Sequence, residues 1–311
     1  MAPKVSEVSD TAQADREKRL VAASSVAAAV LLTTLKIVVG FKTGSIGILS
    51  EAAHSGLDLV AAAVTLWAVR ASARPADHDH PYGHGKIENF SALFETGLLL
   101  ATCVWIAYEA IKRLLFEDVH VEATVWAFAI MFISIVVDIS RSRALSRAAK
   151  KHRSQALEAD ALHFSTDVWS SSVVIVGLLA VVASEAFHIP WLARADAVAA
   201  LGVAGIAVLI SLRLGRKSVD DLLDAVPPDL LSQVAAAAHV EGVREVSQVR
   251  VRRSGPDVFA DVTLEVDRGL SLEAAHELAE RAEEAVRSAV PGSDVVVHTH
   301  PAGDDALPTT G

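Results

Sequence analysis

Long apolar segments alternate with short polar connections over the first two thirds of the chain. Six of these segments contain about 20 or more mostly apolar residues, the length that a helix needs to cross a bilayer. They are residues 20–40, 46–70, 90–115, 121–140, 157–183 and 191–214. The pattern therefore predicts a multi-pass α-helical membrane protein with six transmembrane helices.

The pattern changes after Asp220, where "LLDAVPPDLL" contains a Pro-Pro break typical of a domain boundary. A short helix is expected next, followed by "EVSQVRVRR" and "VFADVTLEV", which alternate as strands do. An amphipathic helix over residues 271–289 and a last strand in "DVVVHTH" complete the segment. The order α-β-β-α-β predicts a C-terminal cytoplasmic ferredoxin-like α/β domain.

These patterns divide the chain into four parts. Residues 1–18 are polar and lack the apolar core of a signal peptide, so we expect a disordered cytoplasmic tail there. Residues 302–311 are expected to form a second disordered tail. The six-helix transmembrane domain is predicted over residues 19–217, and the cytoplasmic domain over residues 218–301.

Composition supports a membrane protein. The chain is 52% hydrophobic, and its mean hydropathy of +0.38 is rare among soluble domains. A formal net charge of −10 argues against nucleic acid as a partner. The single cysteine, Cys103, permits neither an intrachain disulfide nor a cysteine-rich metal site.

Lys and Arg near the ends of the predicted spans indicate the orientation of the chain. Four basic groups lie on the same side of an arrangement with six spans, and the opposite connections, "FKTGS", "FEDVHVE" and "EAFHIP", carry little positive charge. Positively charged loops stay in the cytoplasm. We therefore expect a multi-pass protein of the cell (inner or plasma) membrane with both termini in the cytoplasm.

Two predicted spans contain the same polar pattern. His54 and Asp58 are four residues apart, and His163 and Asp167 repeat this spacing. Residues at i and i+4 share one face of a helix, and ionisable side chains inside a membrane are costly unless they are paired. If the two helices face each other, their two nitrogens and two carboxylates suit a tetrahedral Zn²⁺ ion. The alternative is that each pair forms an internal His–Asp hydrogen bond that only holds the bundle together.

A second polar cluster lies between the second and third spans, in "RPADHDHPYGHGKIEN". Its histidines and aspartates are dense enough to bind Zn²⁺ or a similar ion. They are Asp77, His78, Asp79, His80 and His84. The alternative is a solvated polar loop.

Four sequence stretches resemble landmarks of the cation diffusion facilitators, and in particular of their zinc/iron-type branch. They are "GSIGILSEAAHSGLDL", "PYGHGKIENFSAL", "EADALHFSTDVWSSS" and "PGSDVVVHTHP". The resemblance implies a homodimeric divalent-cation/proton antiporter with six spans and a cytoplasmic ferredoxin-like domain for metal sensing and dimerisation. It also implies a transport site of His54, Asp58, His163 and Asp167 and a loop site of Asp77, His80 and His84.

The cytoplasmic domain departs from the pattern of that family. Ser247 and Thr263 stand where the family's two-metal site has histidines, and His300 replaces an aspartate. A full two-metal site is therefore not expected. The resemblance leaves a single site of His276, His298 and His300, with the partner subunit as a further source of ligands.

The function implied by this resemblance is proton-coupled efflux of divalent cations, most of all Zn²⁺, across a lipid bilayer. Zn²⁺ would be both the transported ion and a regulatory ligand. Fe²⁺, Co²⁺, Ni²⁺, Cd²⁺ or Mn²⁺ as the main ion remains open, because these metals accept overlapping nitrogen and oxygen ligands. A non-transporting membrane metal sensor is the rival class. An intramembrane metalloprotease is not expected, because "HE" occurs only at His276, outside the spans and without the H-E-x-x-H pattern.

Overall fold

The computed structural model describes residues 5–44, 46–115, 125–187 and 195–303. The chain divides into a helical unit, residues 1–219, and a C-terminal unit, residues 220–311. Each unit is described by itself.

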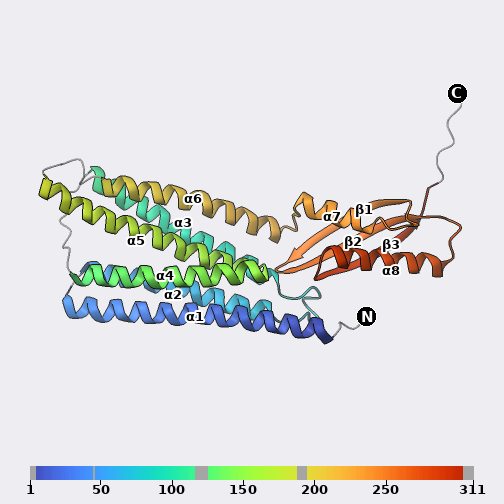
Figure 1. Cartoon of the computed structure of the whole chain (residues 1–311), viewed down its shortest axis with the longest axis horizontal. Coiled ribbons are helices and arrows are strands. Elements are labelled where there is room, and N and C mark those ends of the chain that lie inside the picture. The colour runs from blue at the N-terminus through green and yellow to red at the C-terminus, as the bar shows by residue number, and fades with distance from the viewer. Residues whose placement is uncertain (1–4, 45, 116–124, 188–194, 304–311) are drawn as a thin grey trace, which may run out of the picture. The chain divides into compact units, whose positions relative to one another are not determined.

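The helical unit is built from long helices that run along one another (Figure 1). In this unit α1 packs against α2 and α4, and α5 packs against α4 and α3. Ala207 of α6 joins an apolar cluster with Leu99 of α3. The bounds are α1 Val5–Thr43, α2 Ile46–Ser72, α3 Lys86–Leu115, α4 Val125–His152, α5 Gln155–Phe187 and α6 Ala195–Leu222.

Three helices in the described part of the chain are long and apolar enough to cross a membrane. These candidate spans are Ala12–Thr43 of α1, Glu51–Ser72 of α2 and Lys86–Lys112 of α3. The helices α4, α5 and α6 coincide with the other three predicted apolar segments. Their assignment as spans, and so the total of six, stays a prediction.

The start of α1 differs from the expected disordered tail. The helix begins at Val5, so residues 5–18 are helical. The physical reason lies in Lys18, which is buried with its Nζ atom 3.1 Å from Glu88 Oε1 of α3 and 3.0 Å from Asp15 Oδ1. The other Glu88 oxygen accepts a hydrogen bond from Ser154, just before α5. A buried charge needs such partners, and this network holds the start of α1 in the bundle.

Small residues let the helices of this unit approach closely. Ala22, Ala62, Ala68 and Ala161 belong to a buried cluster shared by α1, α2, α4 and α5. Gly40 of α1 faces α2 so closely that a Cβ atom there would lie 2.7 Å from a methyl carbon of Leu49. Such close packing between helices is what small residues provide in a lipid environment.

The C-terminal unit has the element order α-β-β-α-β that the sequence predicts. Its bounds are α7 Pro228–Ala238, β1 Glu245–Ser254, β2 Asp257–Val266, α8 Leu272–Ala289 and β3 Ser293–Pro301. The strand order is β1-β2-β3, with β1 antiparallel and β3 parallel to β2. The Ser271 side chain caps α8 by accepting a hydrogen bond from the backbone N–H of Ala274 at 3.1 Å.

The core of this unit lies on one face of the sheet. Alternate residues of β2 from Val258 to Val266 are buried with Val234 of α7 and Leu278 of α8. The other face of the sheet is left without a helix among the described residues. Ala302, which was expected in the tail, is bonded to the sheet, because its N–H donates to the carbonyl of Val266 at 2.8 Å. Residues 304–311 lie outside the described residues.

Candidate metal centre

The helices α2 and α5 bring together the two His-x-x-x-Asp pairs. His163 Nε2 of α5 lies 3.1 Å from Asp58 Oδ1 of α2 and 3.6 Å from Asp167 Oδ2 of its own helix. His54 Nε2 lies 3.9 Å from Asp58 Oδ1 and 3.8 Å from Asp167 Oδ1. Each imidazole therefore faces both carboxylates, and each helix contributes one nitrogen ligand and one carboxylate.

Three of these side chains lie close enough to share one metal ion. Ligand atoms of His54, Asp58 and Asp167 all lie within 4.8 Å of one another. His163 adjoins this group through its 3.1 Å hydrogen bond to Asp58. Two carboxylates carry two negative charges when ionised, and a divalent cation or two protons would balance them.

The alternative of two internal His–Asp hydrogen bonds is not what the structure contains. The hydrogen bond at this site runs between helices, from His163 to Asp58, and His54 stands beyond hydrogen-bond distance from both carboxylates. His163 Nδ1 and Asp167 Oδ2 are buried without a hydrogen-bond partner in the described part of the chain. Buried polar atoms of this kind are rare and call for a ligand or water.

A buried lysine beside this site was not singled out from the sequence. Lys36 of α1 donates from Nζ to Ser55 Oγ at 2.7 Å and to Glu51 Oε2 at 3.2 Å, both on α2. Ser55 follows the ligand His54, so α1 holds the ligand helix at this depth. The sequence did contain a signal for Lys36, because an ionisable residue inside a predicted transmembrane segment is a functional candidate by default.

A second buried polar network joins α1, α4 and α5. Arg141 lies with its guanidinium carbon 3.5 Å from the ring centre of Phe164, which follows His163. Its Nη2 atom donates to Ser25 Oγ at 3.0 Å, and Ser25 donates to Asp160 Oδ2 at 3.2 Å. Asp138, one turn before Arg141, pairs with it at 3.3 Å. Asp138 and Asp160 lie inside the fourth and fifth apolar segments and could also have been noted from the sequence.

Glu95 of α3 is a further buried carboxyl group. It accepts hydrogen bonds at Oε1 from Thr65 of α2 and from Ser91, the latter at 3.4 Å, whereas Oε2 has no partner among the described atoms. The sequence pattern does not mark this residue, because an isolated glutamate follows no repeated spacing.

The loop between α2 and α3 brings together Asp77, His80 and His84. His80 Nδ1 lies 3.1 Å from Asp77 Oδ1, and His84 Nε2 lies 3.4 Å from Asp77 Oδ2. Backbone N–H groups of Asp79 and His80 donate to Asp77 Oδ1 at 3.1 and 2.7 Å and fix the carboxylate. Three such ligand atoms can hold a Zn²⁺ ion with a fourth position open to water. His78 and Asp79 point into solvent and pair with each other at 3.4 Å.

The structure does not bring His276, His298 and His300 together within one chain. His298 and His300 lie on the same side of β3, with ring centres 4.7 Å apart. Their neighbours Val295 and Val297 face the core, so both imidazoles point to the open face of the sheet. His276 is on α8, 72% exposed, and pairs with Glu280 at 3.6 Å. Because α8 covers the opposite face, the expected three-histidine site is corrected to a pair.

Ser247 and Thr263 lie close to this histidine pair. Ser247 Oγ donates to the Thr263 carbonyl at 3.4 Å, and Thr263 is paired across the strands with His298. Hydroxyl groups are poor substitutes for imidazole as zinc ligands. The absence of a full two-metal site stays a prediction.

Two family models match this chain, one over each of its two units. The family model described as the cation efflux transmembrane domain matches residues 22–223, and the one described as the cation efflux protein cytoplasmic domain matches residues 227–302. Together they span most of the chain and divide it close to the boundary between its two compact units.

Curated relatives match over nearly their whole length. The cation-efflux pump FieF of Pectobacterium carotovorum is 32% identical over 91% of this chain and 92% of that protein. The FieF pumps of Cronobacter sakazakii and Citrobacter koseri are 34% and 35% identical, each over 91% of this chain and 93% of the relative. The chain therefore belongs to the cation diffusion facilitator family, whose members are cation-efflux transporters and not enzymes.

Proposed function

We propose that this protein exports divalent metal cations, foremost Zn²⁺, from the cytoplasm in exchange for protons. The observation that carries the proposal is the set of two imidazoles and two carboxylates between α2 and α5. Its four His–Asp separations run from 3.1 to 3.9 Å, and ligand atoms of His54, Asp58 and Asp167 all lie within 4.8 Å of one another. Mixed nitrogen and oxygen ligands favour Zn²⁺ over harder ions such as Mn²⁺, which prefer oxygen-rich sites of higher coordination.

Proton coupling follows from the ligand chemistry. A metal ion binds ionised Asp and neutral His, so protons and metal compete for the same four side chains. Entry of the metal from the cytoplasm displaces protons, and protons that return from the other side displace the metal. Histidine suits this exchange because its ordinary pKa lies near cellular pH.

The loop and the C-terminal unit have supporting roles in this proposal. Asp77, His80 and His84 hold a metal ion near the cytoplasmic entrance. His298 and His300, with ligands from a partner subunit, sense rising metal in a homodimer. The family name of the matched cytoplasmic domain, which denotes dimerisation, supports the homodimer.

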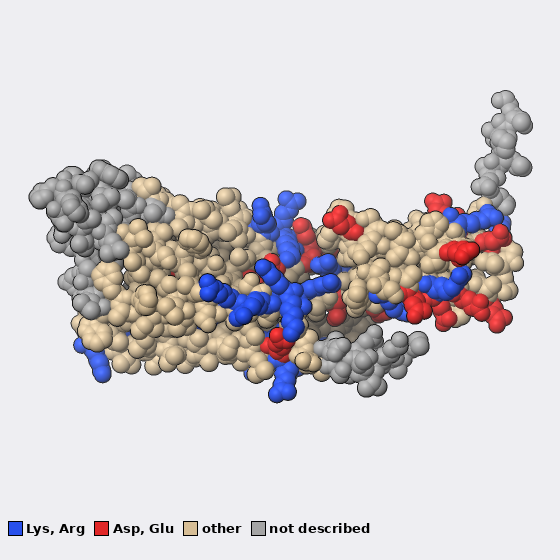
Figure 2. Space-filling view, in the orientation of Figure 1, with Lys and Arg blue, Asp and Glu red and all other residues tan. Residues whose placement is uncertain are grey.

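We further propose that α4, α5 and α6 are the remaining spans and that both termini lie in the cytoplasm of an inner or plasma membrane. Figure 2 supports this orientation, because Lys and Arg gather at one end of the helical unit while most of the visible face beyond them is uncharged. The last turn of α4 belongs to the basic end, with Lys150, Lys151 and His152.

The deciding experiment is transport in proteoliposomes with an imposed pH gradient. Zn²⁺, Fe²⁺, Co²⁺, Ni²⁺, Cd²⁺ and Mn²⁺ are supplied in turn, and metal uptake and internal pH are recorded together. Wild type should move Zn²⁺ fastest, with protons moving the other way. Asp58→Ala and Asp167→Ala should each reduce both signals to background because only one carboxylate remains.

Glu158→Ala is the matched control. Glu158 lies on α5 like Asp167 but is half exposed and pairs with Lys217 at 2.8 Å, so its loss should leave transport intact. Full transport in either aspartate variant would refute the site. Metal transport that ignores the pH gradient would refute proton coupling, and metal binding without transport of any ion would favour the sensor.

A further inference from the structure

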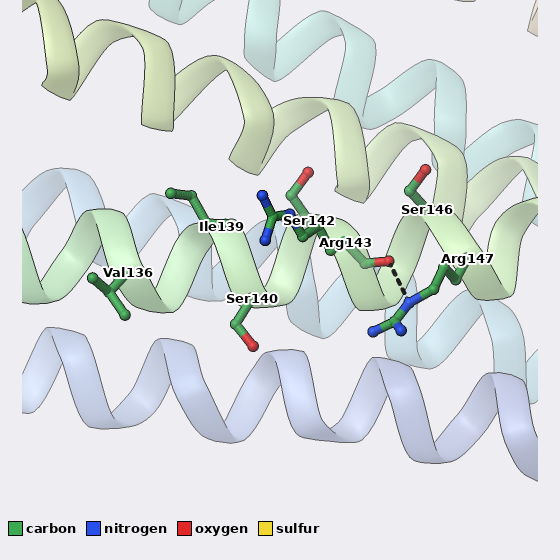
Figure 3. A pocket seen from close by; sticks show the side chains of 7 residues that line it. All are labelled: Val136, Ile139, Ser140, Ser142, Arg143, Ser146 and Arg147. Carbon is green, nitrogen blue, oxygen red and sulfur yellow. Dashed lines mark hydrogen bonds between the residues drawn. The ribbon is translucent and has the colours of Figure 1, made fainter.

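The second half of α4 carries a shallow hollow on its outer surface. Figure 3 shows the hollow from close by, and its volume is about 750 Å³. Its lining changes along the helix from apolar to hydroxyl-bearing and cationic. The residues are Val136, Ile139, Ser140, Ser142, Arg143, Ser146 and Arg147.

The cationic end of the hollow has two guanidinium groups with no acidic partner. Arg143 and Arg147 are four residues apart and share one helix face. Arg147 Nε donates to the backbone carbonyl of Arg143 at 3.2 Å. Within the described ranges, neither guanidinium pairs with a carboxylate.

Three nearby cations are paired within the protein: Arg141 meets Asp138 at 3.3 Å, Lys151 meets Glu17 at 2.5 Å and Lys217 meets Glu158 at 2.8 Å. Arg143 and Arg147 differ from these three, and they lie one turn apart in the same hollow. Two arginines one turn apart suit a phosphate group, because guanidinium forms strong, paired hydrogen bonds to phosphate oxygens.

The apolar end of the hollow points to a lipid as the source of that phosphate. Val136 is 51% exposed, and Phe132, one turn earlier, is 64% exposed. Both lie in the matched transmembrane domain, where such side chains face acyl chains. Inorganic phosphate has no apolar part that could contact Val136 and Ile139.

The spacing along the helix agrees with the layers of a bilayer. With a rise of about 1.5 Å per residue, Arg143 and Arg147 span about 6 Å. A headgroup layer is about 5–7 Å thick on each side of the hydrocarbon core. When the two arginines lie in that layer, Val136 and Ile139 lie at the depth of the acyl chains.

We propose that this hollow is a binding site for an anionic phospholipid of the leaflet at the basic end of the helices. The guanidinium groups of Arg143 and Arg147 hold the headgroup phosphate. Ser140 and Ser146, whose hydroxyls are free of partners among the described residues, donate to its oxygens. An acyl chain lies along Val136 and Ile139. A zwitterionic lipid binds less well, because its ammonium group faces the same two arginines.

The test uses the purified full-length chain in detergent with equal amounts of phosphatidylglycerol and phosphatidylcholine of identical acyl chains. Native mass spectrometry counts the lipids that each protein retains. Wild type should retain phosphatidylglycerol in preference, and Arg143→Gln with Arg147→Gln should lower that preference about tenfold. The matched control is Arg70→Gln with Arg213→Gln, which removes two exposed arginines from α2 and α6 and should keep the preference.

Further arms separate the lipid from its phosphate. Ile139→Asn with Val136→Asn should weaken retention of phosphatidylglycerol while both arginines remain, and excess inorganic phosphate should not displace the lipid. Circular dichroism confirms that each variant is folded before lipids are counted.

Three results would overturn the proposal. They are equal retention of both lipids by wild type, an equal loss in the Arg70 and Arg213 control, and displacement of the lipid by inorganic phosphate. An equal loss in the control would mean that the lipid is attracted to exposed positive charge in general. Displacement by inorganic phosphate would mean that the site binds phosphate alone.

Discussion

The four side chains of the proposed transport site between α2 and α5 differ in how far water reaches them. The side chain of His163 is 4% exposed, and those of Asp58 and Asp167 are 12% exposed. His54 is 34% exposed and makes the longest approaches to the carboxylates. It is therefore the ligand whose replacement disturbs the buried charges least, and the natural position at which to change ion preference.

We predict that His54→Asp broadens the range of transported ions. The substitution leaves one nitrogen ligand and three carboxylates, a harder set that suits Fe²⁺ and Mn²⁺ better than the original. The ratio of initial Zn²⁺ uptake to uptake of each competitor should fall by about tenfold, or about 1.4 kcal/mol. The measurement is proteoliposome uptake, with His78→Asp as a control on an exposed loop position. An unchanged ratio would mean that selectivity is set elsewhere.

The pKa of Asp77 gives a prediction for the loop site. Hydrogen bonds from the His80 backbone N–H and then from its imidazole hold the pKa of Asp77 below its ordinary range. A lowered pKa means that this carboxylate stays ionised at mildly acid pH and gains a proton only in stronger acid. Protonation of Asp77 therefore does not contribute to release of a metal ion from this loop at mildly acid pH.

Asp77→Asn should accordingly weaken Zn²⁺ binding to the loop about tenfold at every pH in this range, so that log Kd plotted against pH is displaced without a change of slope. Calorimetric titration of an Asp58→Ala, His298→Ala background isolates the loop site. Asp79→Asn is the matched control, since that carboxylate points into solvent in the same loop. A change of that slope in the Asp77 variant would show that its carboxylate titrates in this range after all.

At the scale of elements, the sequence predicted which residues share a helix face but not which helices meet. The i, i+4 spacing was enough to place His54 with Asp58 and His163 with Asp167. The contact between His163 and Asp58 joins residues 105 positions apart and depends on packing of the whole bundle. The strands of the C-terminal unit were predicted well, because alternation fixes which side of β2 is buried.

Gly40 gives a prediction about how α1 meets α2. Alanine usually stabilises a helix relative to glycine by about 1 kcal/mol, but a Cβ at Gly40 would press on Leu49, and overpacking costs about 1–3 kcal/mol. Gly40→Ala should therefore lower the thermal unfolding midpoint in detergent. Gly97→Ala is the control, because nothing lies within 4 Å of its Cβ position, and it should be neutral or stabilising. Equal unfolding midpoints for the two variants would mean that α1 and α2 can move apart to accommodate the added methyl group without loss of stability.

At the scale of the whole molecule, the chain combines a bundle rich in buried charge with a small unit built on an apolar core. The sequence predicted this division from the change of pattern after Asp220. It did not predict the helical start of α1, because the burial of Lys18 depends on Glu88, 70 residues away. Nor did it predict that the sheet separates His276 from His298 and His300, since motif positions alone do not say which face of a sheet a helix covers.

The number of metal ions per chain tests the corrected view of the C-terminal unit. A full-length chain with Asp58→Ala and Asp77→Ala should bind at most one Zn²⁺ tightly per protomer, because Ser247 and Thr263 supply hydroxyls in place of imidazoles. Equilibrium dialysis followed by metal analysis gives the count, and His298→Ala should abolish any ion that remains. Two tight ions per protomer would show that ligands in this unit were missed.

The equal division of ligands between α2 and α5 has a consequence for inhibitors. Because each helix supplies one nitrogen and one oxygen ligand, an ion bound at this site bridges the two helices. Transport requires these metal–ligand bonds to break, so the affinity must be high enough for the ion to bind and low enough for it to be released. Cu²⁺ binds such ligands more tightly than the other divalent ions of its series. The ion with the highest affinity should therefore block the carrier rather than cross it.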